Sequence, residues 1–244
     1  MSQGLLPYTV EGVERADTVT GRAGLPLVLE TLRALGLEQA IAAHVHVRER
    51  QSGYSETAKV EALICLLAAG GTCLDDIRVL QADAGLSRLL DRTLPSADTL
   101  RPCLYACHDE ALIAQAQAAR PAGQVAYIPA EPAPLQGLAR VNTALVHRVA
   151  AAGRNTTATL DHDATLQESH KREALAHYQG GRGYQPAAIY WVEQDLVVAD
   201  EYRDGNVPAG METLPLIRRG FAALPATVSP VSYTHLTLPT IYSV

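Results

Sequence analysis

The stretch Thr157-Ala-Thr-Leu-Asp161-His-Asp163-Ala-Thr165 has the small and apolar residues of a strand and carries two carboxylates, two positions apart, near its end. Because successive side chains of a strand point to opposite faces, Asp161 and Asp163 share one face and His162 lies on the other. Neighbouring carboxylates repel one another unless a proton or a cation intervenes, and proteins bind Mg²⁺ through one or two carboxylates together with phosphate oxygens. The stretch therefore indicates metal-assisted phosphate chemistry.

Composition limits the class of protein. The 244 residues are 48% hydrophobic and carry 20 Lys and Arg against 26 Asp and Glu, which gives a net charge of -6. That balance is typical of a globular chain and argues against a uniformly basic nucleic-acid binder, although it is compatible with a local basic groove. The sequence contains neither a run of about 18 apolar residues nor the pattern of a signal peptide, so we expect a cytoplasmic protein without a membrane segment.

The hydrophobic pattern changes along the chain from helical to extended spacing. We expect an α/β protein whose N-terminal helical region precedes an incomplete α/β domain of three strands and a helix. The expected parts are an irregular lead-in over 1–24, a helical DNA-binding or scaffold region over 25–120, a Pro- and Ala-rich linker over 121–137, the start of the α/β domain over 138–230, and a tail over 231–244.

The tail, residues 231–244, departs in composition from everything before it. The codons GTC TCT TAT ACA CAT CTG ACG CTG CCG ACG encode its first ten residues, and this string resembles the mosaic-end adapter of transposase-based library preparation. We expect the tail to be a translated adapter, which is excluded from fold reasoning. The natural reading frame is then expected to continue beyond about residue 230.

Four motifs in order resemble the start of the catalytic domain of bacterial insertion-sequence transposases, DDE domain group 1. They are Leu160-Asp-His-Asp-Ala-Thr165, His170-Lys-Arg172, Tyr178-Gln-Gly-Gly-Arg-Gly-Tyr-Gln-Pro186 and Glu201-Tyr-Arg-Asp-Gly-Asn-Val-Pro208. Upstream, Leu94-Pro-Ser-Ala-Asp-Thr99 resembles the helical region of the same family. The resemblance extends over roughly residues 20 to 230 and is most specific over 157–225.

The resemblance implies an RNase H-like fold in which the first strand carries the first catalytic Asp, the fourth strand the second, and a later helix the Glu. In that family two metal ions, Mg²⁺ or Mn²⁺, assist attack on a DNA phosphodiester. Asp163 matches the first carboxylate best, because Asp-Ala-Thr resembles the family's Asp-Gly-Thr; Asp161 is the alternative and a candidate supporting ligand. The second Asp and the Glu are expected beyond residue 230, so the 244-residue chain is expected to be inactive alone.

The implied partner is DNA carrying the terminal inverted repeats of a transposon, in the nucleoid, and a homodimer is the assembly considered. Candidate contacts to DNA phosphates are Lys171, Arg172, Arg182, Arg203 and Asn206. For the first three a solvated surface position is the alternative. Arg203 and Asn206 belong to an Arg-Asp-Gly-Asn turn, and turn formation explains them better than DNA contact does.

Two other functions are compatible with the residues. A strand that ends in Asp-x-Asp-x-Thr also resembles the first motif of haloacid-dehalogenase phosphatases, in which Asp161 would be the phosphoryl nucleophile and Asp163 the general acid or base. That fold needs parallel strands joined by helical crossovers, whereas a hairpin pattern follows residue 163. The third possibility is a DNA-binding protein without catalytic activity.

Overall fold

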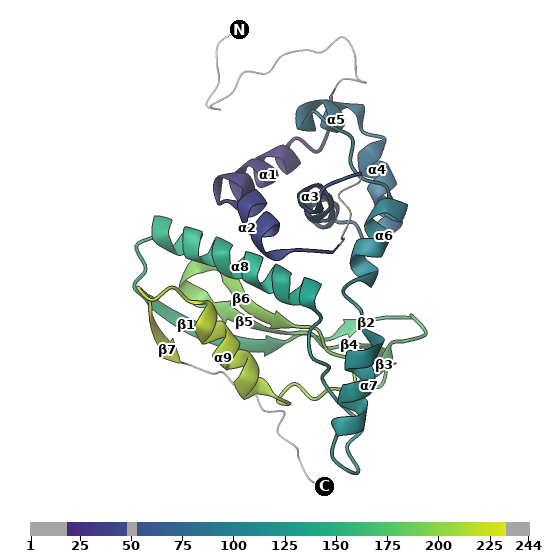
Figure 1. Ribbon diagram of the computed structural model, residues 1–244, viewed down its shortest axis with the longest axis vertical. Coiled ribbons are helices and arrows are strands. Elements are labelled where there is room, and N and C mark those ends of the chain that lie inside the picture. The colour runs from purple at the N-terminus through teal and green to yellow at the C-terminus, as the bar shows by residue number, and fades with distance from the viewer. Residues whose placement is uncertain (1–18, 48–52, 233–244) are drawn as a thin grey trace. The chain divides into compact units, whose positions relative to one another are not determined.

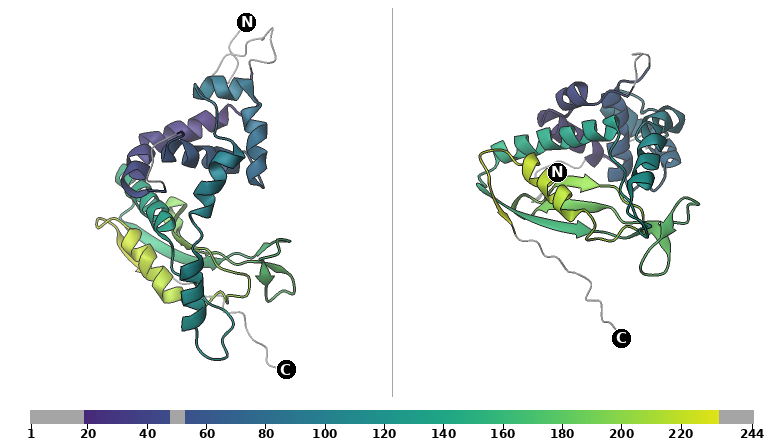
Figure 2. Two further views of the ribbon diagram at one scale, coloured as in Figure 1. Left: turned by 45° about the vertical axis from the view of Figure 1, so that its right-hand side comes forward. Right: turned by 60° about the horizontal axis from the view of Figure 1, so that its bottom comes forward.

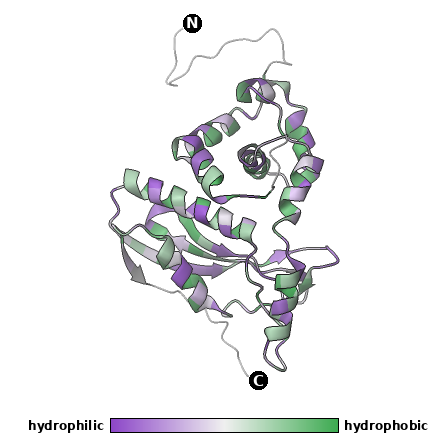
Figure 3. Cartoon of the chain, viewed as in Figure 1, coloured by the Kyte–Doolittle hydropathy of each residue, from purple (hydrophilic) through white to green (hydrophobic). Residues whose placement is uncertain are grey.

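The structure is a computed structural model that describes residues 19–47 and 53–232 (Figure 1). The chain divides into two compact units, one formed by Met1–Thr31 and Ala58–Pro102 and the other by Leu32–Thr57 and Cys103–Val244. Apolar and polar residues alternate along the helices of both units (Figure 3). Among the described residues, no helix combines the length and the apolar character needed to cross a membrane.

The first unit is helical, as the sequence predicts for the N-terminal region. Its elements are α1 (Gly24–Ala34), α3 (Glu56–Ala68), the 3-10 turn η2 (Leu74–Asp76), α4 (Ile77–Gln81), α5 (Ala84–Leu90) and α6 (Ala97–Tyr105). Leucines at helical spacing form its core, including Leu29, Leu86 and Leu100, none of which is exposed to solvent. Asp83 caps α5 by accepting a hydrogen bond from the Leu86 N–H at 2.8 Å.

The second unit packs helices on one face of a β-sheet. Its helices are α2 (Leu37–His44), α7 (Glu110–Ala119), α8 (Ala133–Ala152) and α9 (Thr213–Ala223). Its strands are β1 (Thr157–Ala164), β2 (Gln167–Glu168), β3 (Leu175–Ala176), β4 (Arg182–Tyr184), β5 (Ala187–Trp191), β6 (Leu196–Glu201) and β7 (Ser229–Ser232), with the 3-10 turn η3 (Val192–Gln194) between β5 and β6.

The main sheet has the strand order β6-β5-β1-β7. Strand β5 pairs antiparallel with β1 and β6, and β7 pairs parallel with β1. Helices α8 and α9 lie against one face of this sheet (Figure 2). Val146 of α8 and Leu216 of α9 pack there with Leu160, Ile189 and Trp191. We call this the covered face and the opposite side the open face.

The smaller sheet, with the order β2-β4-β3, continues the ladder of the main sheet. The pairs keep one register throughout: Leu160 with Trp191, Ala164 with Ala187, Thr165 with Pro186 through an N–H···O bond of 3.0 Å, and Gln167 with Tyr184. Because no residue is inserted or omitted between these pairs, the alternation of faces carries over from β1 into β2 and from β5 into β4.

Two expectations about the elements need correction. The predicted linker over 121–137 gives way to α8 at Ala133, because Pro134 occupies the first turn of a helix, where proline is well tolerated. The predicted three strands are joined in the main sheet by a fourth, β7, whose Thr157↔Ser229 and Leu160↔Ser232 pairs hold it beside β1. Ser-Pro-Val-Ser is too short and too polar to give a strand pattern.

The expected adapter tail lies outside the described residues from position 233 onward. The backbone of its first two residues, Val231 and Ser232, completes β7. Most of the expected lead-in over 1–24 also lies outside the described residues, which begin at Val19.

Helix α8 approaches the backbone of α2 at Gly137. A Cβ atom added to Gly137 would lie 2.3 Å from the carbonyl oxygen of His44. We predict that Gly137→Ala lowers the free energy of unfolding by about 1 to 3 kcal/mol, because the two helices must move apart. Gly210→Ala, where an added Cβ meets nothing within 4 Å, is the matched control. Urea denaturation of both variants measures the difference, and equal midpoints would contradict the packing.

The first half of β1 is held by a carboxylate from η3. Glu193 accepts hydrogen bonds from the Thr159 N–H at 2.8 Å and from the Thr159 hydroxyl at 2.5 Å. Partial desolvation acts to raise the pKa of Glu193, but these hydrogen bonds outweigh it and hold the pKa below its ordinary value.

A carboxyl whose pKa is lower in the folded state stabilises the fold above its unfolded pKa and loses this effect as the pH falls through the folded pKa. We therefore predict that Glu193→Gln lowers the melting temperature at neutral pH and that the gap from the wild type closes below about pH 4. Thermal unfolding followed by circular dichroism between pH 3 and 7 measures it. A gap that does not change with pH would show that the Glu193 charge contributes nothing.

Candidate active site

Strand β1 places its two carboxylates on the open face. Ala158 and Leu160 point into the core and are buried, whereas Asp161 is half-buried and Asp163 is exposed. The Thr165 hydroxyl donates a hydrogen bond of 3.1 Å to Asp163 Oδ2. Asp161 Oδ1 is shielded from solvent and has no hydrogen-bond partner among the described residues. On the open face, Asp163 is thus fixed by the Thr165 hydroxyl, and Asp161 has an acceptor oxygen without a partner among the described residues.

His162 lies on the other side of β1, as the alternation predicts. It pairs with Ile189 of β5 and faces the covered side of the sheet. Desolvation lowers the pKa of His162, and the positive charge of Arg203 adds to this effect against the opposing charges of Asp163, Asp161 and Glu201. The imidazole is therefore held in its neutral form and belongs to the interior.

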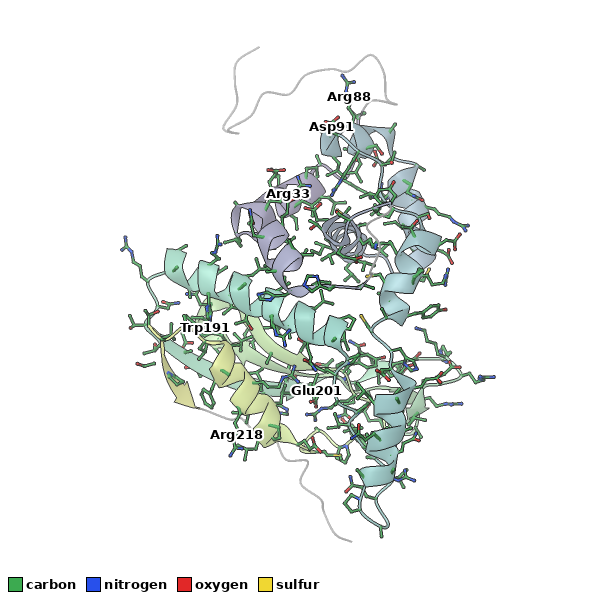
Figure 4. All side chains as sticks on the ribbon, in the orientation of Figure 1. Arg33, Arg88, Asp91, Trp191, Glu201 and Arg218 are labelled. Carbon is green, nitrogen blue, oxygen red and sulfur yellow. The ribbon has the colours of Figure 1, made fainter. Side chains whose placement is uncertain are left out.

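Four charged side chains form a chain of ion pairs on the covered face at the end of β6, and Arg203 is its fully buried member. Arg203, whose side chain has 0% exposure, donates from Nε to Glu201 Oε2 at 2.7 Å and from a terminal nitrogen to the Ala209 carbonyl at 3.3 Å. Arg219 of α9 joins Glu201 to Glu131 at 3.6 and 2.8 Å. Figure 4 labels Glu201 in this region of the sheet, with Trp191 toward its opposite end.

This burial corrects the expected role of Arg203. A guanidinium with no exposed surface and a carboxylate partner is not placed to contact a DNA phosphate. Its terminal NH2 nitrogen is also buried and has no partner among the described residues. Sequence reasoning missed this because Arg203 follows the last strand residue, and only the continued ladder, with the Gln185 N–H donating to the Arg203 carbonyl at 2.9 Å, turns its side chain inward.

The other candidate DNA contacts lie in two places. Lys171 is exposed, and Arg172 has 93% side-chain exposure with Glu173 at 3.3 Å. Arg182 instead fixes the connection between β2 and β3, since it donates to the carbonyls of Ala174 and Arg172, both at 2.7 Å.

Asn206 is half-buried in the turn closed by a 3.0 Å hydrogen bond from the Val207 N–H to the Asp204 carbonyl. Lys171 and Arg172 are therefore the two candidates that are exposed and whose side chains donate no hydrogen bond that fixes a backbone turn among the described residues, although Arg172 is paired with Glu173.

The glycine-rich motif and the Arg-Asp-Gly-Asn turn come together backbone to backbone. The Gly205 N–H donates to the Gly183 carbonyl at 3.0 Å, and Tyr184 forms a bridge with Asp204. A Cβ added to Gly205 would lie 2.6 Å from that same carbonyl oxygen. Glycine is required at position 205 because the two backbones approach so closely. From the sequence alone, this reason could not be distinguished from the formation of a turn.

The two carboxylates provide the hard oxygen donors that Mg²⁺ and Mn²⁺ prefer, but they supply only part of a coordination shell. No group of three or more His, Cys, Asp or Glu side chains that could hold a metal ion occurs within residues 19–47 and 53–232. The unused Asp161 Oδ1 is the one observation that favours a cation at this place. The pairing of β1 with β5 is antiparallel, and this does not fit the helical crossovers that a haloacid-dehalogenase phosphatase needs.

The buried ion pair generates a stability prediction. Arg203→Met leaves Glu201 partly uncompensated, and the free energy of unfolding should fall by about 3 kcal/mol, because breaking a buried pair strands a charge. Arg172→Met, at an exposed arginine, should change it by less than about 0.5 kcal/mol. Guanidinium denaturation of the two variants compares them. If Arg203→Met leaves the free energy of unfolding unchanged, the burial argument fails and the predicted contact of Arg203 with DNA stands again.

Comparison with known proteins finds one family whose model covers the chain. The family model described as "Transposase DDE domain group 1" matches residues 9–229, which is most of the chain. No curated protein and no solved structure matches the chain. The matched region includes the described helices, β1 with Asp161 and Asp163, and the motifs that meet at Gly183 and Gly205. The chain belongs to the transposase DDE domain group 1 family.

Proposed function

We propose that this chain is the DNA- and metal-binding first part of an RNase H-like DDE transposase, with Asp163 as the first catalytic carboxylate and Asp161 as its supporting ligand. The proposal rests on the family match together with the two carboxylates on the open face near the C-terminal end of β1. The partner is chromosomal DNA bearing transposon ends.

The arrangement of the main sheet supports an RNase H-like assignment. Strand β7 is the fourth strand of the main sheet in chain order and lies parallel to β1, with Ser232 opposite Leu160. Parallel neighbours bring their C-terminal ends to the same edge of a sheet, so a carboxylate that follows β7 in the natural frame would come next to Asp161. The family places its second catalytic Asp on the fourth strand.

The chemistry assigned to the site is cleavage of a DNA phosphodiester. An oxygen nucleophile, from water or a 3′-hydroxyl, forms a new bond to phosphorus as the bond to the leaving oxygen breaks, and the nucleophile's proton passes to solvent. A bound divalent ion would polarise the phosphate and stabilise the leaving oxygen. Asp163, held by Thr165, and Asp161 provide the protein oxygens for that ion.

A metal-binding experiment tests this function without requiring turnover. We predict that the chain binds Mn²⁺ weakly and that Asp163→Asn and Asp161→Asn each weaken binding about tenfold or more, which is about 1.4 kcal/mol. Loss of the free Mn²⁺ signal in electron paramagnetic resonance measures it. Asp195→Asn is the control, because Asp195 lies in the turn at the far end of the hairpin with φ 57°, a conformation that Asn tolerates. Mn²⁺ binding that survives the double Asp161 and Asp163 substitution would contradict the assignment.

We also predict that the 244-residue chain does not cut DNA bearing its element's terminal inverted repeats in Mg²⁺, because Asp163 is only the first of the three catalytic carboxylates and the described residues bring no third metal-binding side chain to Asp163 and Asp161. Incubation with end-labelled DNA followed by denaturing gel electrophoresis measures this. Cleavage that Asp163→Ala abolishes would mean that the chain assembles a complete site.

A further inference from the structure

Two tyrosines form an exposed ring pair beyond the carboxylates. The ring centroids of Tyr184 and Tyr202 lie 5.1 Å apart at an interplanar angle of 39°. Tyr202 is 59% exposed, and Tyr184 is half-buried. An exposed aromatic ring supported by a second ring offers a flat apolar surface that is already fixed in place. Neither the metal assignment nor the predicted phosphate contacts use this pair.

The tyrosine pair lies on the same face of the sheet as the carboxylates. One register joins β5 and β4 to the segment that ends at Asp204: Ala188 with Asp200, Ala187 with Glu201, Gln185 with Arg203, and Tyr184 with Asp204. The alternation therefore sends Glu201 and Arg203 to the covered face and Asp200 and Tyr202 to the open face. The burial agrees, since Arg203 is 1% exposed and Tyr202 is 59% exposed.

The spacing between the two features follows from the same ladder. Asp163 pairs with Ala188, and Tyr184 precedes Ala188 by four residues, on the side of the small sheet. At about 3.3 Å per residue, the rings lie on the order of 13 Å from the carboxylates along the strand. On the segment from β1 into β2, the same alternation places Thr165 and Gln167 on the open face between the two features. A DNA strand lying along this face would pass from one feature to the other.

Charges of both signs lie on the segments around the pair, since Asp204 bridges to Tyr184 and basic residues follow β2. Lys171 and Arg172, both exposed, lie on the connection between β2 and β3, and Gln167 of β2 pairs with Tyr184 of β4. Burial, together with Tyr184 and Asp204, raises the pKa of Tyr202 well above its ordinary value. Burial also raises the pKa of Asp204, the acidic neighbour.

We propose that the Tyr184–Tyr202 pair is a stacking platform for an unpaired nucleobase of the DNA strand whose phosphate is bound at Asp161 and Asp163. This inference rests on the proposed function and adds a substrate contact to it. Base stacking on an aromatic ring tolerates any sequence, because every base has a flat face. The platform thus selects a frayed or single-stranded DNA end over a fully paired segment.

The test is the binding of a short single-stranded oligonucleotide that carries 2-aminopurine, a base whose fluorescence is quenched by stacking. The wild-type chain should bind and quench it, and Tyr202→Ala should weaken binding roughly 5- to 100-fold with loss of the quench. Tyr202→Phe keeps the ring and should retain both signals. Tyr178→Ala removes another exposed tyrosine, which is 73% exposed on the turn between β3 and β4, and should behave as wild type.

Salt dependence separates stacking from phosphate contact. Tyr202→Ala should leave the slope of log affinity against log salt unchanged, whereas Arg172→Met should reduce it by about one unit. Binding and quench that survive Tyr202→Ala overturn the stacking platform and leave the proposed function intact. A wild-type chain that binds no oligonucleotide contradicts both, and the Mn²⁺ measurement, which needs no DNA, then tells whether the carboxylate site itself stands.

Discussion

Antiparallel pairing without a register shift, from Leu160 opposite Trp191 to Glu168 opposite Gly183, governs which side chains of the second unit meet. A slip of one residue would turn every side chain of the strand to the other face, bringing the carboxylates of β1 under α8 and α9 and the core residues into water. Burial of Leu160, Ile189 and Trp191 opposes that slip, since a fully buried side chain of this kind contributes about 1.5 to 3 kcal/mol. The core thereby fixes the site.

The same alternation separates two kinds of polar residue that adjoin in sequence. Along the chain, Glu201, Tyr202 and Arg203 follow one another, yet the two charged residues are buried with each other and the tyrosine faces outward. A buried ion pair is costly to desolvate and adds little net stability, so its effect here is to define one inward arrangement of the end of β6 and its turn. Gly183 and Gly205 allow the backbone of β4 and that of the turn after β6 to approach each other closely. The tyrosine pair lies on the opposite face of the sheet from this ion pair.

Much of this organisation follows from the sequence, because period-two alternation over Thr157–Ala164 is local information. The shared face of Asp161 and Asp163, the position of His162 and the hairpin of β5 and β6 are each set within a few residues. The inward turn of Arg203 and the docking of β7 on β1 depend instead on pairing between residues far apart in sequence, and two-residue strands such as β2 and β3 show no periodicity. The start of α8 at Ala133 could not be predicted from the sequence, because proline and glycine occur both in linkers and at the beginnings of helices.

The central claim is that one face of this sheet holds both the carboxylates and the base-binding tyrosines. The most direct measurement is photochemical cross-linking of an oligonucleotide with 5-iodouracil near its end, followed by peptide mapping with mass spectrometry. The account predicts adducts in the peptides that contain Tyr184 and Tyr202. Adducts confined to α8 and α9, which cover the opposite face, would contradict it.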